Sequence, residues 1–300
     1  MNTFYDEDDA RAWLNTYIAK CFQDGGKTVF LPQLTLGEVR VEEFRDPLCW
    51  RMTVVNEGDV EEVEVKIPGI LCRNMLPPIT RKLSPKDKGT IRNLRQFVKV
   101  TGLGVLVYGE FQKKIEEIER LFAEAVKPRI VKSLTFHEYE GEYAIDAHCR
   151  YFTDRRVAPM VKHQGFSDVV DPEHRLEVAR GEDFVQGPDN VVQYLTLVTE
   201  DGKERFEAIS PGDFKNGDIV EIRVSFMCFP LYEGGCKVVP TLRSLILLSN
   251  HARKAAHETM VQKQGSQAPT ASGLGSAPGG ASVRNAGSLK RKFIQLTYTE

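Results

Sequence analysis

The sequence has 300 residues, of which 41% are hydrophobic and 27% are charged. These proportions are ordinary for a soluble globular protein, and they exclude a fully disordered chain, a collagen-like repeat and a membrane protein. Forty basic side chains against 42 acidic ones give a net charge of −2, so the overall charge indicates neither a nucleic-acid nor a membrane partner.

The cysteines and the first residues both favour an intracellular protein. Six cysteines are scattered through mostly apolar stretches, which predicts buried free thiols rather than a disulfide framework. Residues 1–5 run directly into four acidic residues, so the basic start and apolar run of a secretory signal are missing. No stretch is long and apolar enough for a membrane-spanning helix. We therefore expect an intracellular protein, nuclear or cytoplasmic, without a membrane partner.

Residues 1–128 predict a region of mixed helix and antiparallel sheet. Apolar residues at helical or alternating spacing predict helices over 6–24, 85–98 and 110–126, and strands over 28–31, 38–44, 50–55 and 60–67. The last two strands flank Asn56-Glu57-Gly58-Asp59, a sequence typical of a hairpin loop.

Residues 129–260 predict a β-rich module. Strands are expected over 130–139, 143–152, 190–199, 204–209, 219–229 and 237–248, with helices over 171–181 and 251–262. Turn sequences separate the strands, the strongest being Glu200-Asp201-Gly202-Lys203. Several strands at short spacing favour a small antiparallel barrel (OB-like) or a sandwich. The predicted fold class is therefore α+β, because strands follow strands without crossover helices.

Residues 261–300 predict a disordered tail. The segment consists mostly of Gly, Ala, Ser and Pro, which cannot bury enough apolar surface to offset the entropy of ordering. It carries five basic side chains and one acidic one, including the cluster Lys290, Arg291 and Lys292. This cluster is typical of a nuclear import signal, and it would also attract nucleic acid. Alternatively, it only solubilises the chain end, or the apolar residues beside it dock on the body.

The hairpin over 130–152 and the loop after it favour nucleic-acid binding. Aromatic rings interleaved with arginines on a small barrel are what single strands exploit for base stacking and phosphate contacts. Stacking is expected from Tyr139, Tyr143 and Tyr151, and phosphate contacts from Arg150, Arg155 and Arg156. In the alternative interpretation the rings alternate into the core and the arginines lie on a solvated rim.

Two other classes of function remain open. The sequence has no metal-binding or cofactor motif, so we expect neither a metal nor a cofactor. An enzyme would need a site assembled from dispersed residues, such as Cys149 with His137 or His148. A protein-interaction module would use the helix over 110–126, which must then expose its apolar stripe.

Residues 171–248 resemble an uncharacterised family of predicted proteins from mushroom-forming fungi. The resemblance is carried by Asp183-Phe184-Val185, Asp189-Asn190-Val191-Val192-Gln193-Tyr194, Ser210-Pro211, Phe214, Gly217-Asp218-Ile219-Val220-Glu221 and Leu242-Arg243-Ser244-Leu245. None of these segments is a catalytic signature, so the resemblance implies lineage rather than activity. The function that the sequence favours is a non-enzymatic binding module with single-stranded nucleic acid as its partner.

Overall fold

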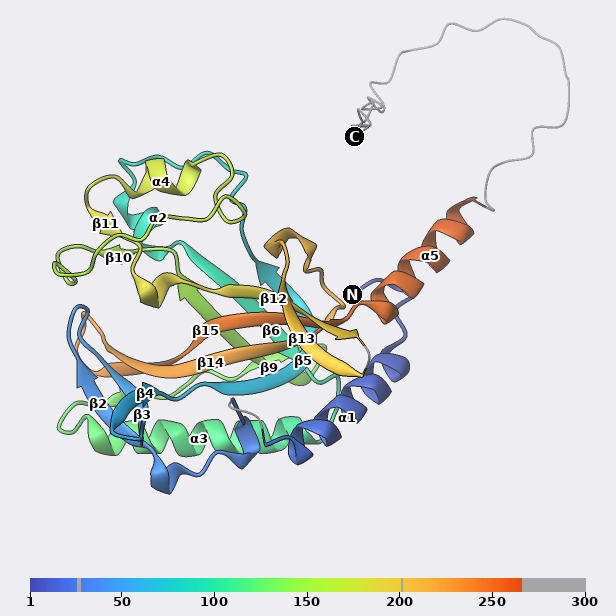
Figure 1. Cartoon of the computed structure of the whole chain (residues 1–300), viewed down its shortest axis with the longest axis horizontal. Helices are drawn as coiled ribbons and strands as arrows, with labels where there is room; N and C mark the ends of the chain where they lie inside the picture. The colour runs from blue at the N-terminus through green and yellow to red at the C-terminus, as the bar shows by residue number, and fades with distance from the viewer. Residues whose placement is uncertain (26–27, 201, 266–300) are drawn as a thin grey trace, which may run out of the picture.

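The computed structural model describes residues 1–25, 28–200 and 202–265, which form an α+β fold as the sequence predicts (Figure 1). The described helices are α1 (Glu7–Gln23), α2 (Lys88–Asn93), α3 (Val107–Ala125), α4 (Arg175–Arg180) and α5 (His251–Gly265). The described strands are β1 (Val29–Phe30), β2 (Arg40–Phe44), β3 (Cys49–Asn56), β4 (Asp59–Glu62), β5 (Val65–Met75), β6 (Arg95–Thr101), β7 (Val131–Lys132), β8 (His137–Tyr139), β9 (Glu142–Arg150), β10 (Thr153–Asp154), β11 (Phe184–Val185), β12 (Gln193–Glu200), β13 (Lys203–Ala208), β14 (Ile219–Pro230) and β15 (Cys236–Ser249).

Five strands form a ring at the centre of the fold. β5 pairs with β6, β6 with β9, β9 with β15, β15 with β14, and β14 with β5 again. All of these pairs are antiparallel except β9 and β15, which run parallel and are joined only where Thr241 meets His148. The first, second, third, fifth and fourth strands thus follow one another around a partly open barrel, which is the arrangement of the oligonucleotide/oligosaccharide-binding (OB) fold.

The barrel draws its strands from both halves of the chain. β5 and β6 belong to the predicted region 1–128, whereas β9, β14 and β15 belong to the predicted module 129–260. The boundary expected at residue 128 therefore does not separate two sheets. Hairpin sequences indicate pairing between strands that are neighbours in the chain. β5 pairs with β14 across more than a hundred residues, and no local sequence pattern indicates such a pairing. The last described element is α5, and residues 266–300, including Lys290, Arg291 and Lys292, lie outside the described residues.

The helix α3 closes one side of the barrel (Figure 1). Its apolar residues recur at helical spacing, and Phe111, Ile118 and Phe122 are completely buried in the main core. The Phe111 ring packs edge-on against Phe30, with 5.6 Å between ring centroids. The stripe that a protein-interaction module would have to expose is thus buried, so α3 offers no apolar docking surface of that kind.

Two chain segments form a lobe at one end of the barrel. Residues 76–94, which connect β5 to β6, and residues 151–187, which follow β9, share a second apolar core (Figure 1). Its buried members are Leu83, Ile91, Leu94, Tyr151, Phe152, Leu176, Ala179 and Phe184. We call these two segments the lobe. The lobe therefore lies next to Arg95, where β6 begins, and Arg150, where β9 ends.

Most predicted hairpins are confirmed, but one helix is wrong in part. Asn56 pairs with Asp59, Tyr139 with Glu142, and Glu200 with Lys203, as the turn sequences predict. The helix expected over 85–98 ends at Asn93, and the chain continues as β6 because it pairs with β5 on one side and β9 on the other. None of the described helices combines the length and the apolar composition that crossing a membrane would require.

Candidate functional site

The outer surface of β6 and β9 carries the chemistry that the sequence places near this hairpin. Successive residues of a strand point to opposite sides, and Val98, Val100 and Ala147 point into the barrel core. The residues between them form three cross-strand pairs on the outside: Lys99 opposite Asp146, Phe97 opposite His148, and Arg95 opposite Arg150. We call this surface the β6–β9 face.

The first pair on the face has its charges balanced. The Lys99 ammonium lies 3.4 Å from the Asp146 carboxylate, and the same carboxylate lies 3.4 Å from Nε2 of His137. Beside Lys99 on the neighbouring strand stands Arg73, whose exposed side chain has no acidic partner among the described residues. This end of the face is therefore positive at its margin and neutral at its centre.

The third pair consists of two arginines. Arg95 and Arg150 are both exposed, and neither forms an ion pair within the described ranges of the chain. Partial burial lowers the pKa of the Arg150 guanidinium, and the nearby charges of Arg95 and Arg92 lower it further. Like charges directly opposite each other on a sheet are destabilising. The cross-strand arginine pair is therefore unfavourable in itself, and neither guanidinium has a hydrogen bond or an ion pair within the described residues.

The middle pair is aromatic and uncharged. The Phe97 side chain is 8% exposed, whereas the His148 ring is half-buried. Burial, assisted by the charges of Arg95, Arg150 and Lys237, lowers the pKa of His148 to about 4, so its ring is neutral at pH 7. Neither ring nitrogen of His148 has a hydrogen-bond partner among residues 1–25, 28–200 and 202–265. The ring therefore offers one donor and one acceptor to a ligand.

A groove of about 270 Å³ crosses this face. It runs over β9, between residues 134–137 on one side and the beginning of β15 on the other. Its lining includes Arg95, Phe97, Phe136, Tyr143, Asp146, His148 and Lys237. The Phe136 ring is 41% exposed, and Lys237 is exposed without an acidic partner in the described chain. The groove thus combines aromatic rings with cations.

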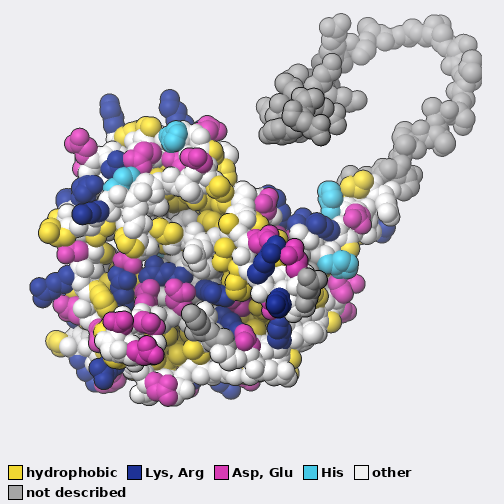
Figure 2. Space-filling view, in the orientation of Figure 1, with side chains coloured by type: hydrophobic (Ala, Val, Ile, Leu, Met, Phe, Trp, Pro, Cys, Tyr) yellow, Lys and Arg dark blue, Asp and Glu magenta, His cyan; other side chains and the backbone are white. Residues whose placement is uncertain are grey.

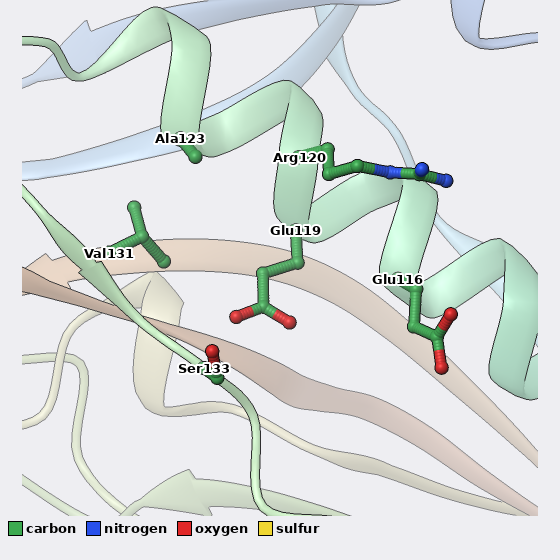
Figure 3. A pocket seen from close by; sticks show the side chains of 6 residues that line it. All are labelled: Glu116, Glu119, Arg120, Ala123, Val131 and Ser133. Atoms are coloured by element: carbon green, nitrogen blue, oxygen red, sulfur yellow. The ribbon is translucent and has the colours of Figure 1, made fainter.

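The wall of this groove is held in place from α3. Glu119 points from α3 toward the chain at Ser133, and one of its carboxylate oxygens accepts a hydrogen bond of 3.0 Å from the backbone N–H of Leu134 (Figure 3). A second hollow of about 330 Å³ lies there, lined by Glu116, Glu119 and Arg120 among others. Its two carboxylates repel phosphate, so this hollow does not extend the cationic surface.

Of the six residues predicted for nucleic-acid binding, one lines the groove and a second lies on the β6–β9 face. Arg150 is on the β6–β9 face, and Tyr143 lines the groove while packing edge-on against Phe136 with 5.7 Å between ring centroids. Tyr139 is on β8, where its hydroxyl accepts a 2.6 Å hydrogen bond from the ammonium group of Met1. Its half-buried ring does not line the groove.

The other three predicted residues belong to the lobe. Tyr151 is 0% exposed in the lobe core, so no base can stack on it in this structure. Arg156 forms a 2.7 Å ion pair with Asp154, and the hydrogen bonds from Arg156 hold the pKa of that carboxyl well below its usual range. Arg155 is half-buried, and its backbone N–H donates to the carbonyl of Asp183. Tyr151, which the base-stacking prediction requires on the surface, thus packs inside.

Sequence reasoning missed Arg95, Phe97, His148 and Lys237 as members of one site. The first two fall in the segment that the sequence predicts to be helical, and a helix prediction makes no use of their alternation with Gln96 and Val98. Read with a period of two, Arg95, Phe97 and Lys99 share one side of a strand and would have indicated this face. Lys237 joins the groove only through the barrel closure, for which the sequence carries no signal.

The dispersed cysteine–histidine site is not assembled. Cys149 points into the core, where its thiol donates to the carbonyl of Asp189 at 3.1 Å and burial raises its pKa to about 12. His148 precedes it on the same strand and therefore points to the opposite side. His137 lies on the outside, beside Asp146. Within the described residues, no three His, Cys, Asp or Glu side chains are grouped so that they could hold a metal ion.

Several other arginines of the described chain are paired with acids. Figure 2 shows Lys and Arg side chains interleaved with Asp and Glu over β3, β4 and β14. In this region Arg51 lies 2.6 Å from Asp189, and Arg243 lies 2.7 Å from Glu62. The cross-strand arginine pair differs from these neutralised clusters because it has no acidic partner in the described structure.

Comparisons with known proteins add little. No protein-family model matches the sequence, and no curated protein matches it. Among solved structures, the chain is similar to gp2.5, a single-stranded DNA binding protein encoded by bacteriophage T7. The identity is 12%, the TM-score is 0.32, and the match covers 62% of this chain and 91% of that chain. A TM-score of this size carries no argument about this chain, and the resemblance to a fungal family stays a prediction.

Proposed function

We propose that this protein binds single-stranded nucleic acid on the β6–β9 face. The observation that carries the proposal is the cross-strand arginine pair, Arg95 and Arg150, which has no acidic partner among the described residues. A like-charge pair is unfavourable in the free protein and becomes favourable when an anion lies between the two guanidinium groups. A phosphate of a nucleic-acid backbone supplies that anion.

The arrangement of the barrel supports the same face. β6 and β9 are the second and third strands of an OB-type barrel, and this is the face on which such barrels bind oligonucleotides and oligosaccharides. This support is an analogy at the level of the fold, so the proposal depends on the side chains rather than on the topology.

The side chains of the face fall into two groups, cations for phosphates and rings for bases. Arg73, Arg95, Arg150 and Lys237 are exposed cations available to phosphates, and their attraction falls as salt rises. The rings of Phe136 and His148 line the groove and are available to bases, which stack on any aromatic surface regardless of sequence. The groove favours a single strand, because the bases of a duplex are already stacked on one another.

A titration with fluorescently labelled oligonucleotides of about twelve nucleotides, the size range of one OB barrel, tests the proposal. Anisotropy is measured at 50 and 200 mM salt for a single strand and for the duplex of the same sequence. If all four cations contact phosphates, the logarithm of the affinity for the single strand falls with the logarithm of salt with a slope of about −3. We expect weaker binding of the duplex. The absence of binding at low salt, or an affinity that does not change with salt, would overturn the proposal.

A further inference from the structure

His148 is the groove residue best placed to meet a base rather than a phosphate. Its backbone is paired with Phe97 on β6 and with Thr241 on β15, so its position is fixed from both sides, and its side chain is shorter than those of the cations around it. Both of its ring nitrogens are without a partner in the described residues. A ring with a pKa of about 4 is uncharged at pH 7, so a phosphate does not attract it as a cation would.

The groups around His148 restrict which base edge can approach. Arg95, Arg150 and Lys237, whose charges act on the His148 ring, have only hydrogen-bond donors. The acid of the face, Asp146, lies within ion-pair distance of Lys99 and His137. A base edge that presents a donor therefore meets other donors and a positive potential, whereas an edge with acceptors is attracted.

We propose that His148 selects bases that present two adjacent acceptor atoms to the groove, namely guanine through N7 and O6 or cytosine through N3 and O2, over adenine and thymine. The inference rests on the proposed function, since it concerns which single strands bind to the β6–β9 face. Adenine places its N6 amino group beside N7, and thymine places N3–H between its two carbonyls, so neither presents two adjacent acceptors. The His148 N–H donates to one acceptor while the surrounding cations favour the other.

The experiment uses thymine oligomers of about twelve nucleotides in which three central positions are guanine, cytosine or adenine. We expect the wild-type protein to bind the guanine or the cytosine oligomer about threefold to tenfold more tightly than the adenine oligomer, the range that one hydrogen bond supplies. Replacing guanine by 7-deazaguanine removes N7, so it tests whether guanine rather than cytosine is the preferred base. Loss of the preference then assigns it to guanine, whereas a preference only for the cytosine oligomer assigns it to cytosine.

Two substitutions of His148 separate hydrogen bonding from ring stacking. His148→Phe keeps a ring but has no donor, so the ratio of the guanine or cytosine affinity to the adenine affinity should fall toward one. His148→Gln keeps an N–H donor and should retain part of the ratio. His257→Phe, an exposed histidine on α5, is the matched control and should leave the ratio unchanged.

The outcomes separate this inference from the proposed function. Salt-dependent binding in which the wild-type protein prefers neither guanine nor cytosine over adenine overturns the inference alone. A preference that survives His148→Phe also overturns it, because another group must then read the base. If no oligomer binds with a salt dependence, the proposed function fails and this inference fails with it.

Discussion

At the scale of single residues, His148 links the site to the stability of the fold. Burial and three nearby cations lower its pKa to about 4 in the folded protein, whereas an unfolded histidine titrates near 6.5. Between these two values the unfolded chain binds a proton at this position and the folded chain does not. Stability therefore falls as the pH drops through this window, and the loss is complete below about pH 4.

His148→Gln removes this titration. We predict that the free energy of unfolding of the variant falls less than that of the wild-type protein as the pH is lowered from 7 to about 4.5, because glutamine takes up no proton. Urea unfolding of both proteins at several pH values measures the difference. A difference between the two proteins that stays constant with pH contradicts the assignment.

Tyr151 was expected to stack on bases, but its position predicts a structural role. It is 0% exposed, and its hydroxyl has no hydrogen-bond partner among the described residues. Tyr151→Phe removes a buried unsatisfied hydroxyl, so we predict an unchanged or higher free energy of unfolding, by up to about 1 kcal/mol. Affinity for single strands should not change. A clear fall in affinity with the fold intact would show that the ring meets the ligand after all.

At the scale of secondary-structure elements, α3 stabilises the barrel through its buried apolar side. Ile118→Ala empties a fully buried position of α3, and we predict a loss of about 2–5 kcal/mol in chemical denaturation. Leu106, at the start of this helix, is 92% exposed, so Leu106→Ala should change stability by no more than about 0.5 kcal/mol. Equal effects of the two substitutions would be inconsistent with the packing described.

The elements that the sequence predicts correctly are those whose signals are local. The helix α1 begins behind Asp6, whose carboxylate accepts from the backbone N–H of Asp9, and local capping of this kind is visible in the sequence. In the turns at Glu57-Gly58 and Glu140-Gly141 the second residue has a positive φ angle, which glycine tolerates, so hairpin prediction succeeds there. The helix prediction is wrong over residues 94–98, because pairing with β5 and β9 overrides the local preference of this segment.

The site was predictable only in part, for the same physical reason. Arg150 is the last residue of the alternating strand β9, and its exposure follows from that alternation. Tyr151 is the next residue, but it belongs to the lobe, whose core depends on residues 76–94 as well. Phe97 and His148 face each other through pairing of distant strands, and a single sequence carries no record of that pairing.

At the scale of the whole molecule, the barrel joins segments that the sequence places in separate regions. The ring brings β5 and β6 together with β14 and β15, so both ends of the described chain contribute to one core. The β6–β9 face and its groove depend on this closure, because β15 supplies Lys237. Residues 261–265 continue α5, and the predicted tail beyond them is outside the described part of the chain.

The basic cluster Lys290, Arg291 and Lys292 remains a prediction of nuclear import. We predict that changing the three residues to Ala in a fluorescent fusion shifts the protein from nucleus to cytoplasm, because an import receptor needs the positive charges. Fluorescence imaging compares this variant with one in which Arg284, a single basic residue outside the cluster, is changed to Ala. An unchanged distribution would remove the import prediction.

In the proposed function, the cross-strand arginine pair binds the phosphates of a single strand. The most direct test measures affinity at 50 and 200 mM salt for the Arg95→Ala/Arg150→Ala variant and for Arg205→Ala, whose arginine is ion-paired with Glu200 and Glu207 on the separate hairpin of β12 and β13. Loss of two phosphate contacts predicts weaker binding and a salt slope shallower by about 1.4, with the Arg205 variant unchanged and all proteins folded. If the double variant binds with the affinity and the salt slope of the wild-type protein, the claim is contradicted.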